Sequence, residues 1–183
     1  MVCAAGHLHD AKTAVPTGCT AVGILGNVTE TGHGLILALR NATSQSWNTI
    51  NGWTSVTTYA GTTLKVLPDD AARGTYLTSY TTLGSTAVSN WAVAQKSDYV
   101  AIFTNLGSTK VHPDYPECPY PTFDANVNAY ITGVGGEDLS GSYCSATEDV
   151  LFGDEEEACR FDGSCWSTFM KHYPCGVWPV LGF

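Results

Sequence analysis

Residues 143–183 read YCSATEDVLFGDEEEACRFDGSCWSTFMKHYPCGVWPVLGF, and this stretch decides the fold. Its two ends, 145–148 (SATE) and 177–183 (VWPVLGF), have the apolar content of buried strands. Between them, residues 159–176 show neither the two-residue period of a strand nor the 3.6-residue period of a helix. A packed element needs a periodic apolar face, whereas a surface that meets a partner gathers aromatic residues and arginine. The middle of the stretch is therefore predicted to be a binding surface that the rest of the chain holds in place.

The first part of the chain is predicted to contain a hairpin and a long loop. Residues 20–25 (TAVGIL) and 34–40 (GLILALR) are expected to pair as two strands. The second strand is apolar on both faces and is therefore expected to be central in its sheet. Residues 41–63 are polar and are interpreted as an ordered loop that Trp47 and Trp53 pin to the body.

The middle of the chain predicts two helices. One spans 68–83 and begins at Pro68, and a clearer one spans 97–106, where apolar residues recur on one face. The proline-rich stretch 108–124 cannot be regular structure, and 126–132 (NVNAYIT) is predicted to be a short strand. Antiparallel strands are then expected at 142–147, 158–161, 165–170 and 177–183.

The composition fits one domain, spanning 1–183, and argues against several classes of partner. With 44% hydrophobic and 14% charged residues, the chain is neither disordered nor membrane-embedded. A net charge of −9 with 8 basic residues argues against nucleic acid, because phosphate binding needs clustered lysine and arginine. No apolar run approaches the roughly 20 residues that span a bilayer, so no membrane insertion is expected. Residues 1–10 lack a basic start followed by an apolar run, so no signal peptide is visible.

Seven cysteines cannot all pair within one chain. Cys3 and Cys19 flank an N-terminal segment that a disulfide can close, and the other five lack the C-x-x-C spacing of a typical zinc site. A metal-binding interpretation exists for the histidines and aspartate of 7–10 (HLHD), but a polar edge strand is favoured. The acidic run 154–157 can offer calcium ligands, yet such a run is more often a solvated loop. We therefore expect no metal and no cofactor.

Four motifs, taken in their order along the chain, resemble the motifs of a known protein family. They are ETGHGLILAL at 30–39, SNWAVAQKSDYVAIFTNLG at 89–107, SGSYCSATE at 140–148 and VWPVLGF at 177–183. Together, across residues 20–183, they resemble the C-type lectin fold as bacterial, phage and archaeal surface proteins use it. These proteins include fimbrial-tip-like proteins of gut bacteria and the variable proteins of diversity-generating retroelements. The resemblance implies an α+β fold with two helices packed on short antiparallel strands and extensive ordered loops.

The chain departs from the family pattern where a retroelement would rewrite its gene. Trp91 is kept, but alanine, valine and alanine replace the arginine, leucine and proline that usually follow it. Trp178 stands where arginine is common, and Cys144 stands where an aromatic residue is usual. The resemblance therefore favours a retroelement variable protein over an ordinary adhesin.

Retroelements of this kind mutate adenines, so an asparagine codon can become most residue types, but not tryptophan, methionine, lysine, glutamate or glutamine. Within 159–177 only Trp166, Met170 and Lys171 lie outside that set. Trp166 and Lys171 are then expected to be fixed scaffold positions. The abundance of cysteine is attributed to randomised codons rather than to a plan of disulfides.

The predicted ligand-binding region spans 143–178. Phe161 and Phe169 can each pack inward or face a partner with equal odds, because strand alternation directs about half of such residues into the core. The predicted contact residues are Cys144, Leu151, Phe152, Cys159, Arg160, Phe161, Asp162, Ser164, Cys165, Ser167, Thr168, Phe169, His172, Tyr173, Pro174 and Cys175.

The function predicted from these features is non-enzymatic recognition of an unknown protein or host-surface ligand, on a virion or cell surface. One alternative is a fimbrial-tip or surface adhesin with an invariant binding site. Another is an oxidase of the formylglycine-generating type, which needs Cys159 and Cys165 as neighbours on adjacent strands. The acidic residues 155–157 argue against this oxidase, because negative surroundings raise the pKa of a thiol.

Overall fold

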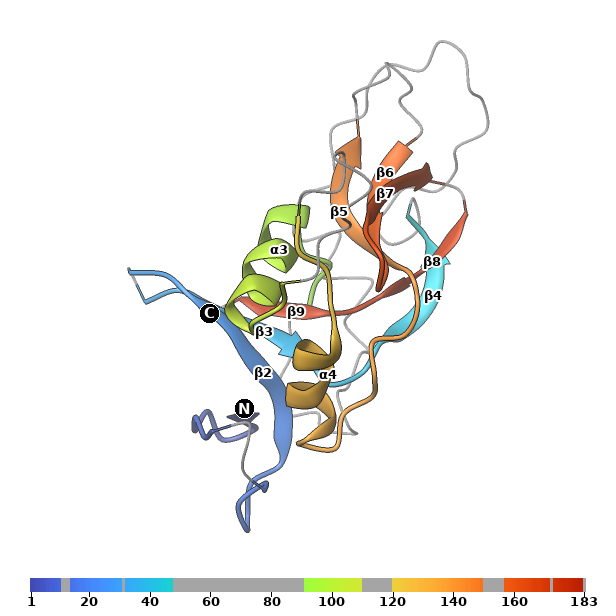
Figure 1. Cartoon of the computed structure of the whole chain (residues 1–183). Helices are drawn as coiled ribbons and strands as arrows, with labels where there is room; N and C mark the ends of the chain where they lie inside the picture. Colours follow the sequence, from blue (N-terminus) through green and yellow to red (C-terminus); the bar gives the residue numbers. More distant parts are fainter. Residues whose placement is uncertain are drawn as a thin grey trace.

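The computed structural model has an α+β fold, which confirms the predicted class (Figure 1). Within its described residues, two helices accompany two mostly antiparallel sheets, and helix α3 (Lys96–Asn105) contacts strands of both sheets. The structure describes residues 1–10, 14–30, 32–47, 91–109, 120–149, 157–171 and 173–182.

The first sheet has the strand order β1-β2-β3-β9, and each neighbouring pair is antiparallel. Its strands are β1 (Val2–Cys3), β2 (Ala21–Val28), β3 (Gly34–Ala38) and β9 (Val180–Gly182). The predicted hairpin is confirmed, with Ile24 of β2 opposite Leu37 of β3. β3 lies inside the sheet, as predicted, and Leu37 is fully buried. Cys3 and Cys19 form a disulfide with their Cα atoms 5.5 Å apart, which confirms that pairing.

The second sheet has the strand order β4-β8-β5-β6-β7. Its strands are β4 (Ala42–Ser46), β5 (Tyr143–Asp149), β6 (Glu157–Phe161), β7 (Trp166–Met170) and β8 (Pro174–Val177). β5 and β8 run parallel, and the other neighbours are antiparallel. The strands predicted at 142–147, 158–161 and 165–170 are confirmed as β5, β6 and β7.

Strand β4 corrects the prediction that 41–63 is loop throughout. It pairs with β8 at the edge of the second sheet. Trp47, which follows β4, is buried as predicted, and its indole N–H donates to the carbonyl of Ser145 at 2.8 Å. Trp53 and the helix predicted over 68–83 lie outside the described residues.

The prediction of one strand over 177–183 is wrong. The chain forms β8 in the second sheet and β9 in the first, and Trp178 and Pro179 connect them. The indole N–H of Trp178 donates to the carbonyl of Ala38 in β3 at 2.7 Å, and its carbonyl accepts from the hydroxyl of Tyr99 at 2.6 Å. Burial raises the pKa of the Tyr99 phenol above its ordinary range, so this hydroxyl keeps its proton and remains a donor. Trp178 therefore ties both sheets to α3.

Helix α3 confirms the helix predicted over 97–106. Tyr99, Ile102 and Phe103 are fully buried on the face that packs against β2, β3 and β5. Its start is capped, because the backbone N–H of Gln95 donates to the carboxylate of Asp98 at 3.1 Å.

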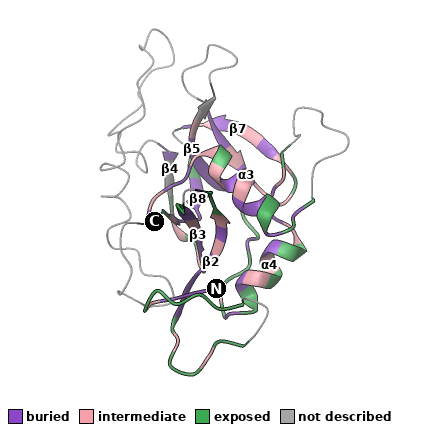
Figure 2. Ribbon diagram, turned by 90° about the vertical axis from the view of Figure 1, so that its left-hand side faces the viewer, coloured by how far each residue is buried: buried purple, intermediate pink, exposed green. Residues whose placement is uncertain are grey.

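Helix α4 (Ala125–Thr132) shows that the strand predicted at 126–132 is wrong. The side chain of Asp124 caps the helix by accepting from the backbone N–H groups of Asn126 and Val127, at 2.9 Å and 3.2 Å. Val127 and Ile131, four residues apart, are buried, while the outer face of the helix is exposed (Figure 2). The described residues of the proline-rich stretch 108–124, which are 108–109 and 120–124, have no regular structure, as predicted.

Phe161 of β6 is the centre of an aromatic cluster that joins the second sheet to α3. Its side chain is fully buried, and neighbouring rings surround it at distances typical of favourable aromatic pairs. The distances from its ring centroid are 4.7 Å to Tyr99, 4.9 Å to Trp166, 5.3 Å to Phe103, 5.6 Å to Tyr143 and 6.2 Å to Phe123.

Replacing Phe161 by alanine tests how far the fold depends on this cluster. We expect Phe161→Ala to lower the free energy of unfolding by about 3–5 kcal/mol, because it empties a closely packed site. Urea unfolding followed by tryptophan fluorescence measures the loss. Ser164→Ala, at an exposed position in the next turn, should change stability by no more than about 0.5 kcal/mol. A loss of less than about 1 kcal/mol for Phe161→Ala would contradict the central role of this ring.

Candidate ligand-binding surface

The predicted binding region, 143–178, contains four strands that lie side by side in the second sheet (Figure 1). They occur in the order β8-β5-β6-β7, and of the described strands of this sheet only β4 comes from elsewhere in the chain. The described strands of the region are therefore neighbours in one sheet, and main-chain hydrogen bonds fix the positions of their side chains.

Strand alternation divides the side chains of the β6–β7 hairpin between two faces. Phe161 lies opposite Trp166, and both point into the aromatic cluster. Arg160 lies opposite Ser167 on the other face, and Ala158 lies opposite Phe169 two positions further along. We call the sheet face that carries Arg160, Ser167 and Phe169 the outer face.

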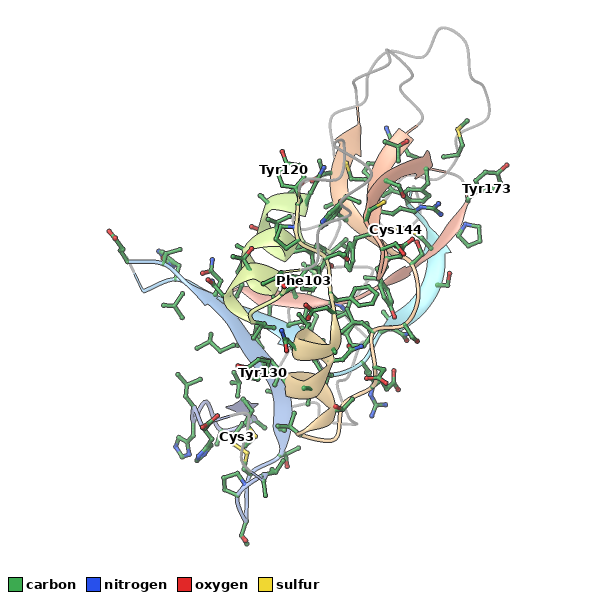
Figure 3. The ribbon with its side chains drawn as sticks, viewed as in Figure 1. Cys3, Phe103, Tyr120, Tyr130, Cys144 and Tyr173 are labelled. Atoms are coloured by element: carbon green, nitrogen blue, oxygen red, sulfur yellow. A yellow bond between two sulfur atoms is a disulfide. The ribbon has the colours of Figure 1, made fainter. Side chains whose placement is uncertain are left out.

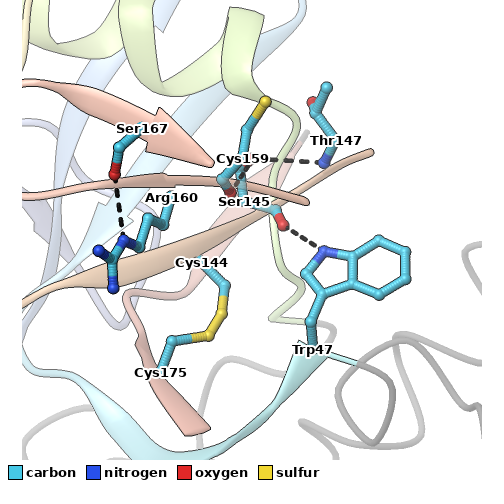
Figure 4. The surroundings of a disulfide bond; sticks show 8 residues. All are labelled: Trp47, Cys144, Ser145, Thr147, Cys159, Arg160, Ser167 and Cys175. Carbon is cyan, nitrogen blue, oxygen red and sulfur yellow. Dashed lines mark hydrogen bonds between the residues drawn. A yellow bond between two sulfur atoms is a disulfide. The ribbon is translucent and has the colours of Figure 1, made fainter. Parts of the chain in front are cut away.

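Arg160 is held on the outer face by two neighbours. Its Nε donates to the hydroxyl of Ser167 at 3.1 Å (Figure 4). Its guanidinium carbon lies 5.8 Å from the centroid of the Phe169 ring. Phe169 is buried, whereas Arg160 and Ser167 are half-buried. A guanidinium has five N–H donors, and its contacts with described residues use one of them. Arg160 therefore presents a preorganised group with donors left for a carboxylate or a carbonyl.

Beside Arg160, a disulfide joins β5 to β8. Cys144 lies opposite Arg160 and is bonded to Cys175, with the two Cα atoms 5.8 Å apart (Figure 4). These two cysteines therefore have a structural partner, which was not expected from the sequence. Cys144 therefore shares a sheet face with Arg160, but both cysteines are buried, so they brace the sheet and do not offer side chains to a partner.

Cys159 and Cys165 do not form the neighbouring pair that an oxidase of the formylglycine-generating type needs. The residue opposite Cys159 on β7 is Thr168. Cys165 lies before β7, in the turn that joins the two strands, where its carbonyl accepts from the backbone N–H of Asp162 at 3.2 Å. The hairpin register therefore separates the two thiols.

Asp162 shapes the turn between β6 and β7. Its carboxylate accepts from the backbone N–H groups of Ser164, at 2.7 Å, and Cys165, at 3.1 Å. The turn is also tied to the segment before α4, since the Thr122 hydroxyl donates to the Asp162 carbonyl and the Trp166 indole donates to the Pro121 carbonyl. Asp162, predicted as a charged contact for a partner, thus has a clear local role in holding the turn.

The predicted contact residues fall into four groups by their accessibility. Those with buried side chains are Cys144, Cys159, Phe161, Phe169 and Cys175. Those with half-buried side chains are Arg160, Asp162, Cys165, Ser167 and Thr168. Those with exposed side chains are Ser164, Tyr173 and Pro174, whereas Leu151, Phe152 and His172 lie outside the described residues.

Tyr173 has the largest exposed aromatic surface among the described residues. Its side chain is 57% exposed and projects away from the ribbon just before β8 (Figure 3). Its backbone N–H donates to the carbonyl of Met170 at 3.0 Å, which fixes the turn between β7 and β8. A tyrosine on a fixed turn loses little conformational freedom on binding and offers both an apolar ring and a hydroxyl.

A cavity of about 480 Å³ lies where α3 begins, beside β5. The ammonium of Lys96 lies 4.5 Å from the ring centroid of Tyr120 and 5.5 Å from that of Trp166, so it places a positive charge at a largely apolar site. The sequence pattern does not indicate this cavity, because Lys96 and Tyr120 come from separate segments that only the tertiary fold brings together. The lining residues are Gln95, Lys96, Ser97, Val100, Tyr120 and Thr147.

No protein-family model matches the chain, and no curated protein matches it in sequence. Among the described residues, no helix has both the length and the apolar character needed to cross a bilayer.

Removing the second disulfide tests whether it braces this surface. We expect the double variant Cys144→Ala, Cys175→Ala to lose about 2–4 kcal/mol of unfolding free energy, because a crosslink across 31 residues restricts the unfolded chain. Guanidinium unfolding under non-reducing conditions measures the loss. Cys165→Ser leaves both disulfides in place and should cost no more than about 0.5 kcal/mol. Equal stability of the double variant and the parent would show that the crosslink does not support the sheet.

Proposed function

We propose that the protein is a non-enzymatic receptor-recognition protein that displays a hypervariable surface on a C-type lectin scaffold, diversified by a retroelement. The observation that carries the proposal is that the four described strands of the region 143–178 are neighbours in one sheet. The described side chains of this region include a buried aromatic cluster and half-buried or exposed positions such as Arg160, Ser167 and Tyr173. Such an arrangement lets recognition change while the core stays the same.

The distribution of residue types supports a diversified segment. Trp166 and Lys171, which adenine mutation of an asparagine codon cannot produce, are both buried. The indole of Trp166 belongs to the aromatic cluster, and the ammonium of Lys171 lies 4.8 Å from the ring centroid of Trp47. These contacts suit fixed scaffold positions. Ser167 and Thr168, which such mutation can produce, are more accessible.

The rigidity of the sheet supports tolerance to variation. Three features restrict the main chain of the sheet. They are the aromatic cluster, the Cys144–Cys175 disulfide and the turn at Asp162. Substitutions at accessible positions usually change stability by only about 0.5 kcal/mol. A fixed main chain also lowers the entropy lost on binding, so affinity can come from the side chains that change.

The side chains available in this variant suit a protein or a host-surface ligand. Tyr173 offers an exposed aromatic ring, and Arg160 offers a positioned guanidinium. Tyrosine and arginine give the largest energies at recognition surfaces. The proposed location is a virion or cell surface, where such recognition takes place. The separation of Cys159 from Cys165 supports a binding role over an oxidase.

The arrangement of the sheets supports the C-type lectin scaffold. The chain leaves the sheet that carries the binding region at Val177 and completes the other sheet with β9, beside β3. Helix α3 packs against both sheets, and Trp178 links all three. The motifs at 89–107, 140–148 and 177–183 supply α3, β5 and the connection from β8 to β9.

Sequencing the gene and its flanking DNA in sibling isolates tests the proposal directly. We expect a near-identical repeat beside the gene that differs from it at adenines. Substitutions among isolates should fall at accessible positions such as Ser167, Thr168 and Tyr173, and should avoid Phe161 and Trp166. If the segment 143–178 is invariant among isolates and no repeat is found, the proposal is wrong. A surface adhesin with a fixed binding site is then the better explanation.

A pair of display libraries tests the tolerance that the proposal requires. One library replaces Ser167, Thr168 and Tyr173 with the residue types that a mutated asparagine codon can yield. The matched library makes the same replacements at Phe161 and Trp166. We expect most members of the first library to keep the protease resistance of the parent, and most members of the second to lose it. Equal damage in both libraries would count against a variable surface.

A further inference from the structure

The N-terminal segment brings three metal-binding side chains together, far from the binding region in the sequence. The sulfur atoms of Cys3 and Cys19 and a ring nitrogen of His9 all lie within 4.8 Å of one another. The two sulfur atoms form a disulfide. The disulfide does not involve His9, although the imidazole of His9 lies beside it.

Main-chain hydrogen bonds hold these residues in place independently of the disulfide. The N–H of Cys3 donates to the carbonyl of His7 at 2.9 Å, and the N–H of His9 donates to the carbonyl of Met1 at 3.0 Å. These bonds fold residues 1–9 into a narrow ribbon, and the pairing of β1 with β2 brings the segment that contains Cys19 to its side. Breaking the sulfur–sulfur bond therefore leaves the three side chains close together.

Two thiolates and an imidazole are ligands that Zn²⁺ prefers. In a tetrahedral zinc site, Zn–S bonds of about 2.3 Å and Zn–N bonds of about 2.0 Å place neighbouring ligand atoms roughly 3.3–3.8 Å apart. Ligand atoms that already lie within 4.8 Å need only small side-chain rotations to meet these distances. Cys3 is buried, Cys19 is half-buried and His9 is exposed, so a metal ion can enter from the His9 side.

We propose that this ribbon is a redox-switched zinc site, closed by the disulfide when oxidised and by Zn²⁺ when reduced. A dithiol reductant transfers two electrons to the Cys3–Cys19 bond, is itself oxidised to a disulfide, and leaves two protein thiols. The thiols release two protons as they bind Zn²⁺, neutral His9 gives the third ligand, and water takes the fourth position. The metal ion does not change its oxidation state. Either closure holds the ribbon against β2, so this end of the first sheet stays ordered in both redox conditions.

Zinc titration of the full chain tests the site, with ZnCl₂ alone as the probe. The chain is reduced with a phosphine, moved to oxygen-free buffer and titrated against a chromophoric chelator. We expect the reduced parent to bind one zinc ion per chain through this site, and the oxidised parent to bind none here. His9→Ala should weaken this binding at least tenfold, whereas His7→Ala, an exposed histidine of the same ribbon, should change it less than twofold. Equal effects of the two histidine variants, or no zinc binding by the reduced parent, would overturn the proposal.

Alkylation mapping separates this site from the other cysteines. The reduced chain is treated with iodoacetamide with and without ZnCl₂, and each cysteine is followed by mass spectrometry. We expect zinc to protect Cys3 and Cys19 at least fivefold, and to leave the half-buried Cys165 unprotected. The His9→Ala variant should lose this protection while it still forms the Cys3–Cys19 disulfide when oxidised, which shows that it folds. Protection confined to other cysteines would assign the zinc elsewhere and refute the site.

Discussion

The packing of Phe161 against the rings around it is the constraint on which the rest of the structure depends. This one side chain connects β6 to helix α3 through Tyr99, to β5 through Tyr143 and to the segment before α4 through Phe123. Trp166, opposite Phe161 across the hairpin, points into the same cluster, so Arg160 and Ser167 lie on the other face, where both are half-buried. The outer face, with Arg160 and Ser167, is thus a direct result of the inner packing.

The parts of the fold that follow from local patterns could be predicted from the sequence. β2 and β3 are short apolar runs separated by turn residues, and α3 carries apolar residues at helical spacing. Helix α4 was not predicted, because β-branched residues and asparagines favour other structures, yet the cap at Asp124 and the spacing of Val127 and Ile131 mark it as a helix. The division of 177–183 between two sheets could not be predicted, because it depends on distant partners of Trp178.

Strands β5, β6 and β7 of the candidate surface could be located from the sequence, but the direction of their side chains could not. Where apolar and polar residues do not alternate, the sequence does not show which side chains face the core. A register change of one residue exchanges the two faces of a strand. Here the register depends on the turn that Asp162 holds and on an irregularity in β5 between Cys144 and Glu148. The bond between Cys144 and Cys175 is likewise invisible in the sequence, since spacing alone does not define disulfide connectivity.

The pairing of strands that are distant in the sequence has a consequence for how the chain folds. β3 pairs with β9 and β4 pairs with β8, so each sheet joins early and late parts of the chain. Such pairings must close very long loops before they gain any contacts, which slows folding compared with a helical protein of similar size. Neither half of the chain contains all the described strands of either sheet. Sequence changes that leave these distant pairings intact can therefore alter accessible side chains without changing the folding route.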